Sequence, residues 1–384
     1  MKGHVRLFAV PAAFTLLTLG VFVGASQPSG AAKAAGSSRS SSATKVKDES
    51  KSGLVTGWIY DGSVADKGYD EEWYDAQLYL EKTLGIKATF VQNTPYTSQW
   101  TSTAESMATA GAKIVFDPGE GGSLFYAACK KFPKVACVEA NGTEPFPSNS
   151  TAVYSENWED SYLEGMAAGL LTKGKAAKIG FLEAFADTPA PVIETLNALV
   201  LGCQATHPGC TAVADVVNSW YNPPVETEDL NALTDAGADI LASTQNDPAS
   251  IEVAAKRGVW GIGSWADPVS SGPKAFVTAT DANYGPTLAT IAESVINGTY
   301  KGGKIDLFGF GQGLTLAPWG PDVPKSVQTT VDAAEAKMQA GHNYFCGPIY
   351  SNANVLEVKA GSCMSTLQVY DQWNWYVRGV SISK

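Results

Sequence analysis

Short apolar runs recur along the chain from residue 54 onward, and most of them end in polar or Gly/Pro residues. Compact runs of this kind, bounded by turn signals, are typical of buried strands. The pattern predicts strands over residues 54–60, 87–92, 113–116, 135–139, 178–182, 213–218, 240–243 and 259–264.

The segments between these runs place apolar residues at three- and four-residue spacings, which is typical of amphipathic helices. They predict helices over residues 69–84, 159–171, 191–202, 225–236 and 249–256. Strands that alternate with helices favour a parallel α/β sheet with right-handed crossovers. The strands are too many for one comfortable sheet, so we expect two Rossmann-like lobes, with the chain crossing between them more than once. Ligands of such folds bind at the carboxyl ends of the strands, in the cleft that the two sheets share.

The first 25 residues have the pattern of a secretory signal peptide. Lys2 and Arg6 precede an apolar run, and small residues suitable for cleavage follow at 23–25. We expect an exported protein, periplasmic or extracellular in the cell envelope and cleaved near Ala25; an uncleaved membrane anchor is the alternative, because the run nears spanning length. No cysteine lies there to carry a lipid anchor. Residues 26–52 are rich in Ala, Gly, Ser and Lys and predict a flexible linker.

Composition and charge narrow the function. Hydrophobic residues make up 45% of the chain and charged residues 17%, which indicates a globular protein. The net charge of −11 would repel phosphate, so nucleic acid and anionic membranes are not expected partners. Only three histidines are present, and neither a helical zinc motif nor a phosphate-binding Gly-Lys-Ser/Thr loop occurs. We expect no histidine-centred catalysis, no metal and no cofactor.

The six cysteines form three couples that are close in sequence. An exported chain meets an oxidising compartment, and each couple brackets a turn-like stretch such as residues 206–209. We therefore predict three local disulfides; buried free thiols are the alternative. The predicted pairs are Cys129 with Cys137, Cys203 with Cys210, and Cys346 with Cys363.

Aromatic, amide and carboxylate side chains follow several of the predicted strands. Aromatic faces stack on a planar ring, and carboxylates accept hydrogen bonds from its donors, so the combination suits a flat ligand or a sugar. Each Asp or Asn has an alternative role as a helix cap or turn residue, and each aromatic one could pack beneath a loop. Such residues lie at 60–70, 185–187, 218–222, 245–247 and 265–267, and Tyr60 and Asp70 are among the candidates for ligand binding in the first of these stretches.

Several motifs carry a family resemblance in a consistent order along the chain. They lie at residues 57–60, 66–69, 163–168, 217–223, 236–240, 256–263, 298–303 and 316–321. On them the chain resembles the basic membrane protein family of extracytoplasmic solute-binding proteins, which are similar to purine nucleoside receptors of ABC importers. The resemblance implies an α/β type I periplasmic binding protein, with two lobes joined by a multi-strand hinge that closes over the ligand.

On this basis we divide the chain into two lobes. The N-terminal lobe is expected to span 53–174, with 268–300 and part of 341–384. The C-terminal lobe is expected to span 175–267, with 301–340.

The resemblance also assigns roles to single residues. It places an acid at Asp66 and a stacking aromatic at Tyr69. The ligand contacts that it implies in the second lobe are Phe185, Trp220, Asn246, Asp247 and Asp267, followed by Asn283. Trp265 and Ala282 stand where an acid and a lysine commonly serve the ribose. These two departures favour a free base over a nucleoside, and Trp265 could itself stack on the ligand.

The sequence therefore predicts a receptor without catalytic activity. We expect a monomer that binds a small planar ligand, a purine base or nucleoside, and delivers it to an ABC permease. The alternatives are a ligand-sensing subunit of a signalling system and a binder of another solute such as a sugar. An enzyme is disfavoured, because no nucleophile with an adjacent base is evident.

Overall fold

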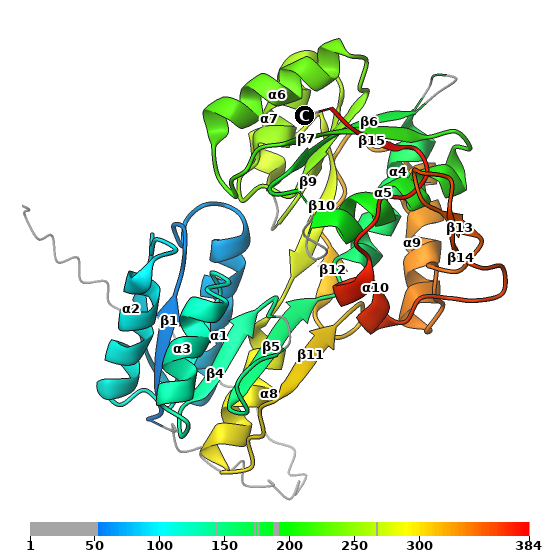
Figure 1. The fold of residues 1–384 in the computed structure, drawn as a ribbon. Coiled ribbons are helices and arrows are strands. Elements are labelled where there is room, and N and C mark those ends of the chain that lie inside the picture. Colours follow the sequence, from blue (N-terminus) through cyan, green and yellow to red (C-terminus); the bar gives the residue numbers. More distant parts are fainter. Residues whose placement is uncertain are drawn as a thin grey trace, which may run out of the picture. The chain divides into compact units, whose positions relative to one another are not determined.

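A computed structural model describes residues 53–142, 145–172, 174, 177–186, 192–265 and 268–383. The predicted signal peptide, the predicted linker and Asp267 lie outside these ranges. Within them the strands form two large sheets, as the sequence predicts (Figure 1). All eight predicted strands and all five predicted helices are present, with bounds that differ by a few residues at most.

The first sheet has six strands that are all parallel. Their order is β11 (Lys304–Phe308), β5 (Ser150–Ser155), β4 (Ala136–Ala140), β3 (Ile114–Asp117), β1 (Val55–Ile59) and β2 (Lys87–Val91). The central strands β1, β3, β4 and β5 are almost entirely buried, as expected of a parallel sheet covered on both faces. Their carboxyl ends therefore share one edge of the sheet.

The second sheet has seven strands, and only β12 runs antiparallel to its neighbour. Their order is β12 (Leu314–Leu316), β10 (Phe276–Ala282), β9 (Trp260–Gly263), β8 (Ile240–Ser243), β6 (Lys178–Glu183), β7 (Thr211–Val216) and β15 (Val380–Ile382). A short 3-10 helix, η2 (Pro268–Ser271), precedes β10.

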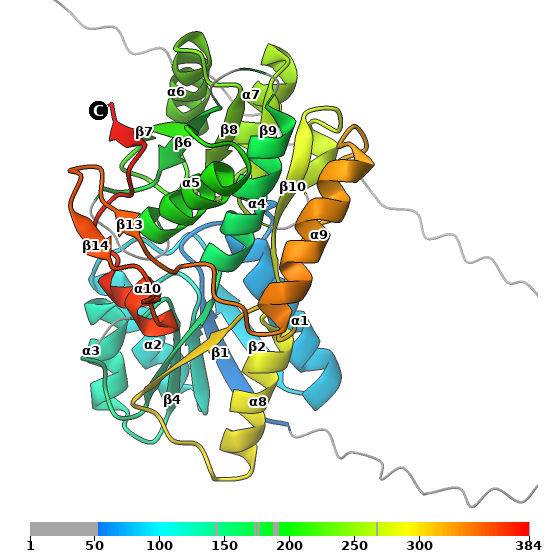
Figure 2. The ribbon, with the colours of Figure 1, turned by 90° about the vertical axis from the view of Figure 1, so that its right-hand side faces the viewer.

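Helices cover both faces of each sheet. The helices of the first sheet are α1 (Tyr69–Leu84) and α8 (Gly285–Ile296), which pack together, and α2 (Ser98–Thr109) and α3 (Ser123–Lys131), which pack on the other face. The helices of the second sheet are α4 (Trp158–Leu171), α5 (Glu194–Thr206) and α9 (Lys325–Gln339) on one face, and α6 (Pro223–Asp235) and α7 (Ala249–Arg257) on the other. Figure 2 shows α4 beside α9.

The C-terminal tail after α9 is attached to both sheets. It contains the hairpin β13 (Ile349–Tyr350) and β14 (Leu356–Val358), the helix α10 (Thr366–Gln372) and the edge strand β15. The Tyr370 hydroxyl of α10 donates to the Gly142 carbonyl oxygen, 2.8 Å away, just beyond β4 of the first sheet. Strand β15 pairs with β7 of the second sheet. The tail thus bridges the two sheets.

The chain passes between the sheets at residues 156–157, 283–284 and 309–313. Sheet membership differs from the lobe boundaries expected from the sequence at three elements. Strand β10 belongs to the second sheet, β11 belongs to the first, and α4 packs against α5 and α9 of the second. The crossings are short, and no change of composition marks them, so the sequence pattern does not locate them.

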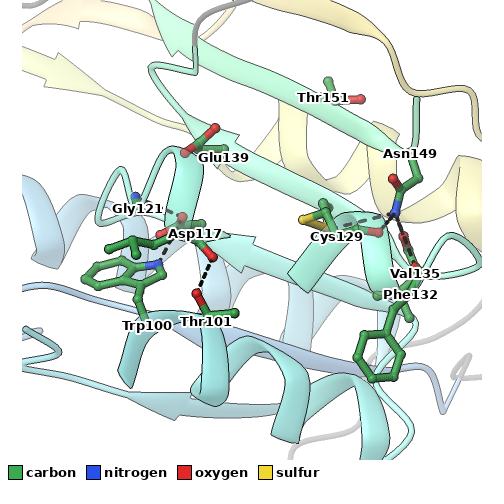
Figure 3. The surroundings of a disulfide bond; sticks show 12 residues. Trp100, Thr101, Asp117, Gly121, Cys129, Phe132, Val135, Glu139, Asn149 and Thr151 are labelled. Atoms are coloured by element: carbon green, nitrogen blue, oxygen red, sulfur yellow. Dashed lines mark hydrogen bonds between the residues drawn. A yellow bond between two sulfur atoms is a disulfide. The ribbon is translucent and has the colours of Figure 1, made fainter. Parts of the chain in front are cut away.

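The cysteines pair as predicted, in three local disulfides. Beside the first of these, Asn149 donates from Nδ2 to the carbonyl oxygens of Cys129, Phe132 and Val135, at 3.1, 3.3 and 2.7 Å (Figure 3). The side chain therefore closes the turn before β4. In the part of the chain that the structure describes, no helix is both long and apolar enough to cross a membrane.

Candidate functional site

Strand β1 leads into the first wall of the site. Its sequence Val-Thr-Gly-Trp-Ile is buried from Thr56 to Ile59, and the next residue, Tyr60, is fully buried as well. The Tyr60 hydroxyl donates to Gln77 Oε1 on α1, 3.2 Å away. Tyr60 was a candidate contact, but the structure places it in the core beneath the loop rather than at the cleft. A loop over residues 61–68 then connects β1 to α1.

Two carboxylates hold this loop against the N-terminus of α1. Asp66 accepts from the backbone N–H groups of Gly68 (2.8 Å) and Glu71 (3.2 Å) through Oδ1, and from Asp70 N–H (3.2 Å) through Oδ2. Asp70 Oδ2 in turn accepts from Gly62 N–H at 2.9 Å. These contacts satisfy the free donors of the helix end and place negative charge where the helix dipole favours it.

Burial opposes the ionised form of both groups. Desolvation raises the pKa of Asp66 to about 6, against the three hydrogen bonds that lower it. The pKa of Asp70 is raised well above its usual value, first by burial and then by repulsion from Asp61 and Asp66. Burial also raises the pKa of Asp61, against a hydrogen bond with Tyr96. The loop therefore presents closely spaced carboxyl groups to the cleft.

The loop after β3 forms the second part of this wall. Asp117 Oδ2 accepts from Gly121 N–H (3.0 Å) and from the Trp100 indole N–H (3.2 Å), as Figure 3 shows. Glu139, at the end of β4, accepts from Gly122 N–H at 2.6 Å. A Cβ at Gly121 would lie 2.1 Å from Trp100 Nε1, so only glycine lets the loop approach the indole ring this closely. The side chains of Asp117 and Glu139 thus hold the loop after β3 in place.

This fixed loop presents Glu120 at its tip. Glu120 has φ of 57°, the left-handed region that side chains other than Gly and Asn rarely adopt. Burial, then repulsion from Asp61 and Glu139, raises the pKa of Glu120 well above its usual value. A residue that is both strained and costly to ionise is a common mark of a functional position.

The opposite wall comes from the second sheet. Trp220, Asn246 and Trp265 each lie just beyond the carboxyl end of a strand, β7, β8 and β9 respectively. The Asn246 N–H donates to the Trp220 carbonyl oxygen at 2.9 Å, which joins two of these loops. The Phe185 ring, beyond β6, meets the Trp220 ring edge to face at 5.3 Å between centroids. All four residues were predicted ligand contacts.

Between the walls lies a pocket that we call the aromatic cleft. From the first wall it is lined by Asp61, Tyr69, Tyr96, Pro118, Gly119 and Glu120, and from the second by Trp220, Asn246 and Trp265. In this structure the aromatic cleft is narrow, with a cavity volume of about 10 Å³, which is room for about one water molecule. The rings of Tyr69 and Trp265 meet across it, 5.1 Å apart between centroids.

A wider pocket, the outer mouth, adjoins the cleft and shares Asp61, Tyr96, Trp220 and Asn246 with it. The outer mouth is also lined by Asp66, Asp70, Phe185 and the loop residues beside them. Both pockets therefore lie at the carboxyl ends of strands from the two sheets, where parallel α/β folds bind ligands.

The structure brings most, but not all, of the predicted contacts together. Tyr69, Trp220, Asn246 and Trp265 line the aromatic cleft, and Asp66, Asp70 and Phe185 line the outer mouth. Asp247 instead accepts from Ala249 N–H at 2.8 Å just before α7, while Asn283 accepts from Gly285 N–H at 3.1 Å just before α8. These two are helix-start residues away from the pocket.

Sequence reasoning missed five residues that line the aromatic cleft, Pro118 and Gly119 and the three with polar side chains, Asp61, Tyr96 and Glu120. Asp61 directly follows the first predicted strand, at 54–60, so its position in the sequence already indicated a strand-end carboxylate. Glu120 follows the predicted strand at 113–116 by only a few residues, so the rule that ligands bind at carboxyl ends of strands would have indicated it. Tyr96 carries no comparable signal, because it reaches the cleft through a stack on Trp100, 5.0 Å between ring centroids. In the described residues no cluster of His, Cys, Asp and Glu is arranged to hold a metal ion.

Comparison with known proteins agrees with this architecture. Residues 54–340 match the sequence model of the Bmp family, described as ABC transporter substrate-binding protein PnrA-like. The chain is 30% identical over 334 residues to a purine-binding protein of Brucella abortus, covering 85% of this chain and 93% of the relative. It is 28% identical over 290 residues to a putative ABC transporter glucose-binding protein of Haloferax volcanii, covering 73% and 71%.

Among solved structures, a solute-binding protein of an ABC transporter system from Conexibacter woesei superposes with a TM-score of 0.60. The match covers 75% of this chain and 97% of that structure at 21% identity, so it bears on the fold. It supports the two-lobed arrangement of a periplasmic solute-binding protein.

Proposed function

The chain belongs to the Bmp family of PnrA-like ABC transporter substrate-binding proteins, and we propose that the solute it binds is a purine base or nucleoside. Membership of this family gives the general role of the protein. It is an extracytoplasmic, non-catalytic binding protein of an ABC importer, with a small-molecule ligand and a membrane permease as partner. The proposal concerns which solute occupies the aromatic cleft.

The observation that carries the proposal is the chemistry of the two walls. Tyr69, Trp220 and Trp265 offer ring surfaces from both lobes, and Asp61, Glu120 and Asn246 offer acceptors around them. A purine has two fused rings to lie among aromatic side chains and N–H groups at its edge for carboxylates to accept. The Brucella relative, whose name states purine binding, supports the same class.

A free base fits the second wall better than a nucleoside. Trp265 is only 5% exposed and lies against Tyr69, so its indole takes up space at the position where the family commonly has an acid that serves the ribose. Ala282, where the family often has a lysine, is buried and donates its N–H to Glu72 Oε1 at 3.2 Å. Neither position offers a sugar hydroxyl a charged partner.

A sugar is the second candidate. The Haloferax relative is named for glucose binding, and carboxylates beside aromatic faces also suit a pyranose, whose hydroxyls donate and whose ring face stacks. The aromatic surfaces on both walls favour a flat ring over a puckered one.

A thermal-shift screen of the mature protein tests the proposal. The panel contains purine bases, nucleosides, pyrimidines, sugars and amino acids, because a ligand that binds only the folded state raises the melting temperature. We expect the largest shift from a purine base. A shift from nucleosides only would reject the free-base preference, and a shift from sugars only would reject the purine class.

A further inference from the structure

Two buried hydrogen-bond donors of the aromatic cleft have no acceptor within the described part of the chain. They are the Tyr69 hydroxyl and the Trp265 indole N–H. Tyr69 is 6% exposed and Trp265 is 5% exposed, so neither group has ready access to water. Buried donors in folded proteins are normally paired, because an unpaired donor loses its hydrogen bond to water without gaining another. Both groups are therefore available to an acceptor that comes from outside the protein.

The two donors belong to opposite walls of the cleft. Tyr69 is the first residue of α1, in the first wall, and Trp265 lies just beyond β9, in the second. Both line the aromatic cleft, where their ring centroids are 5.1 Å apart. The cavity has room for about one water molecule, so these rings move apart when a ligand enters. A ligand that accepts from both donors would then connect the two lobes.

Both donors keep their protons at neutral pH. An indole N–H does not titrate, and it can only donate. Burial, and then repulsion from Tyr284 and Glu120, raises the pKa of Tyr69 well above its usual value. The neighbouring Trp73 indole N–H lowers the pKa of Tyr69, but it can donate only to the hydroxyl oxygen and leaves the hydroxyl proton unused. The two donors thus keep their role whether the carboxyl groups around them are ionised or neutral.

Ring nitrogens are the acceptors that suit this pair of donors. Aromatic side chains line the cleft from both walls, so a flat ligand lies with its faces against rings and its polar atoms at its edge. The lone pair of a ring nitrogen points outward from that edge, in the plane of the ring. A purine base is neutral and carries such nitrogens on both of its fused rings. One molecule can therefore accept at two separate points.

We propose that the Tyr69 hydroxyl and the Trp265 indole N–H select the ligand, each by donating to a different ring nitrogen of one neutral heteroaromatic base. This inference rests on the proposed function, and it adds the atoms by which the solute is recognised. It gives Tyr69 a polar contact in addition to the stacking surface of its ring. It also gives Trp265 a polar role at the position where the family commonly has an acid.

Deaza analogues test the inference, because each replaces one ring nitrogen by C–H and keeps the shape of the base. Isothermal titration of the mature protein at neutral pH, where the bases are uncharged, first compares adenine, hypoxanthine and glucose. The tighter of the two bases is then compared with its 3- and 7-deaza analogues and, for adenine, with the 1-deaza analogue. We expect two of the replacements to weaken binding by about tenfold each, since a buried donor then loses its partner.

Two variants assign each loss of affinity to its donor. Tyr69→Phe removes only the hydroxyl, and Trp265→Phe keeps an aromatic ring but removes the N–H. Each variant should abolish one of the two losses and keep the other, because a missing acceptor costs nothing once its donor is gone.

Matched controls remove the same groups elsewhere in the protein. Tyr79→Phe removes an exposed hydroxyl on α1, the helix that begins at Tyr69. Trp319→Phe removes an indole N–H that already donates to Asp332, 3.1 Å away. Neither residue lines the aromatic cleft or the outer mouth, so both controls should keep both losses.

The melting temperature of the ligand-free variants separates binding from a structural role. The Tyr69 hydroxyl has no acceptor among the described residues, so Tyr69→Phe should not lower the melting temperature. A lowered melting temperature together with unchanged losses for the deaza analogues would mean a structural hydroxyl and would overturn the proposal.

The outcomes also separate this inference from the proposed function. Losses that all persist in either variant overturn the pairing; for Trp265, this result would mean that the indole faces the small inner pocket that it also lines, beside Asn157 and Glu164. A base whose deaza analogues all bind equally well overturns the inference and leaves the purine proposal intact. Glucose as the only ligand overturns both, and so does a panel in which neither base binds.

Discussion

At the scale of single residues, Trp220 is the aromatic side chain of the second sheet that is shared by the aromatic cleft and the outer mouth. It lies at the end of β7, and its ring contacts Phe185 on one side. Its backbone is tied to Asn246, so its position does not depend on a ligand being present. A rigid ring at this point can stack on the solute as the lobes close.

We predict that Trp220→Ala weakens ligand binding by about tenfold or more, because one stacking surface is worth roughly 1–3 kcal/mol to a base. Isothermal titration with the best ligand of the screen measures the effect. Tyr79→Ala is the matched control, since Tyr79 is an exposed ring on α1 outside both pockets. Equal affinities of the Trp220 variant and the control would remove Trp220 from the site.

At the scale of elements, the C-terminal tail depends on one buried amide. Asn197, on α5, donates from Nδ2 to the Trp375 carbonyl oxygen and accepts at Oδ1 from Val377 N–H, both at 2.8 Å. Asn197 is fully buried, so these backbone groups have no ready access to water. The two bonds fix the segment that leads into β15.

We predict that Asn197→Ala lowers the free energy of unfolding by about 2–4 kcal/mol, because two backbone groups lose their partner in a buried place. Urea denaturation followed by tryptophan fluorescence measures it. In the control Asn231→Ala, an exposed Asn bonded only to its own helix is removed, and the change should stay within about 0.5 kcal/mol. A loss as small as that of the control would mean that β15 is held by its strand pairing alone.

At the scale of the whole molecule, buried carboxyl groups link folding to pH. Burial raises the pKa of Asp66 to about 6, and the pKa values of Glu139 and Glu156 to about 7. In the unfolded chain such groups titrate near pH 4. Between these limits the folded protein holds more protons than the unfolded chain, so stability falls as the pH rises.

We therefore predict that the ligand-free protein melts at a higher temperature at pH 5 than at pH 8, by at least about 3 °C. Calorimetry across this range measures the difference, and saturating ligand should be absent. The variant Glu156→Gln should flatten the dependence in part, because one of the titrating groups is gone. A melting temperature that rises from pH 5 to pH 8 would contradict the raised pKa values.

Closure of the two lobes depends on a glycine at their contact. A Cβ at Gly68 would lie 2.6 Å from the Asn246 carbonyl oxygen, across the boundary between the first and second walls. We predict that Gly68→Ala weakens ligand binding by about tenfold, since the lobes can no longer meet there, and leaves the melting temperature of the free protein nearly unchanged. Titration and calorimetry of the variant measure both, with Ser102→Ala as control, since Ser102 is an exposed residue of α2 outside both pockets. Wild-type affinity in Gly68→Ala would mean that this contact is not needed for binding.

Local patterns were sufficient for much of the fold. As far as β9, the apolar runs and helical spacings predict every strand except β5 and every helix except α2 and α3, and the spacing of the cysteines predicts all three disulfides. Helix α2 and strand β5 carried weaker patterns. The polar sequence of α2 buries only Trp100, Ala104 and Met107. Strand β5 was not predicted, although its side chains are all buried.

The candidate site was predictable where a side chain follows its own strand directly. Trp220, Asn246 and Trp265 are of this kind, and all three line the aromatic cleft. Asp247 and Asn283 have the same composition signal but accept from the backbone N–H two residues on, in the turns that lead into α7 and α8. Residue type alone does not separate such a turn residue from a ligand contact. Tyr96 is missed for the opposite reason, because its place depends on a ring contact with Trp100 on the following helix.

The sequence by itself determined the class of fold, the family and the chemical character of the strand ends, because these depend on periodicity and on residue type within short segments. Only the tertiary structure decided which strands share a sheet, as β10 and β11 show, and which side chains meet across the cleft. It alone brought Asp61 and Glu120 to one wall of the aromatic cleft. Such pairings arise from contacts between distant segments, and a local pattern carries no information about them.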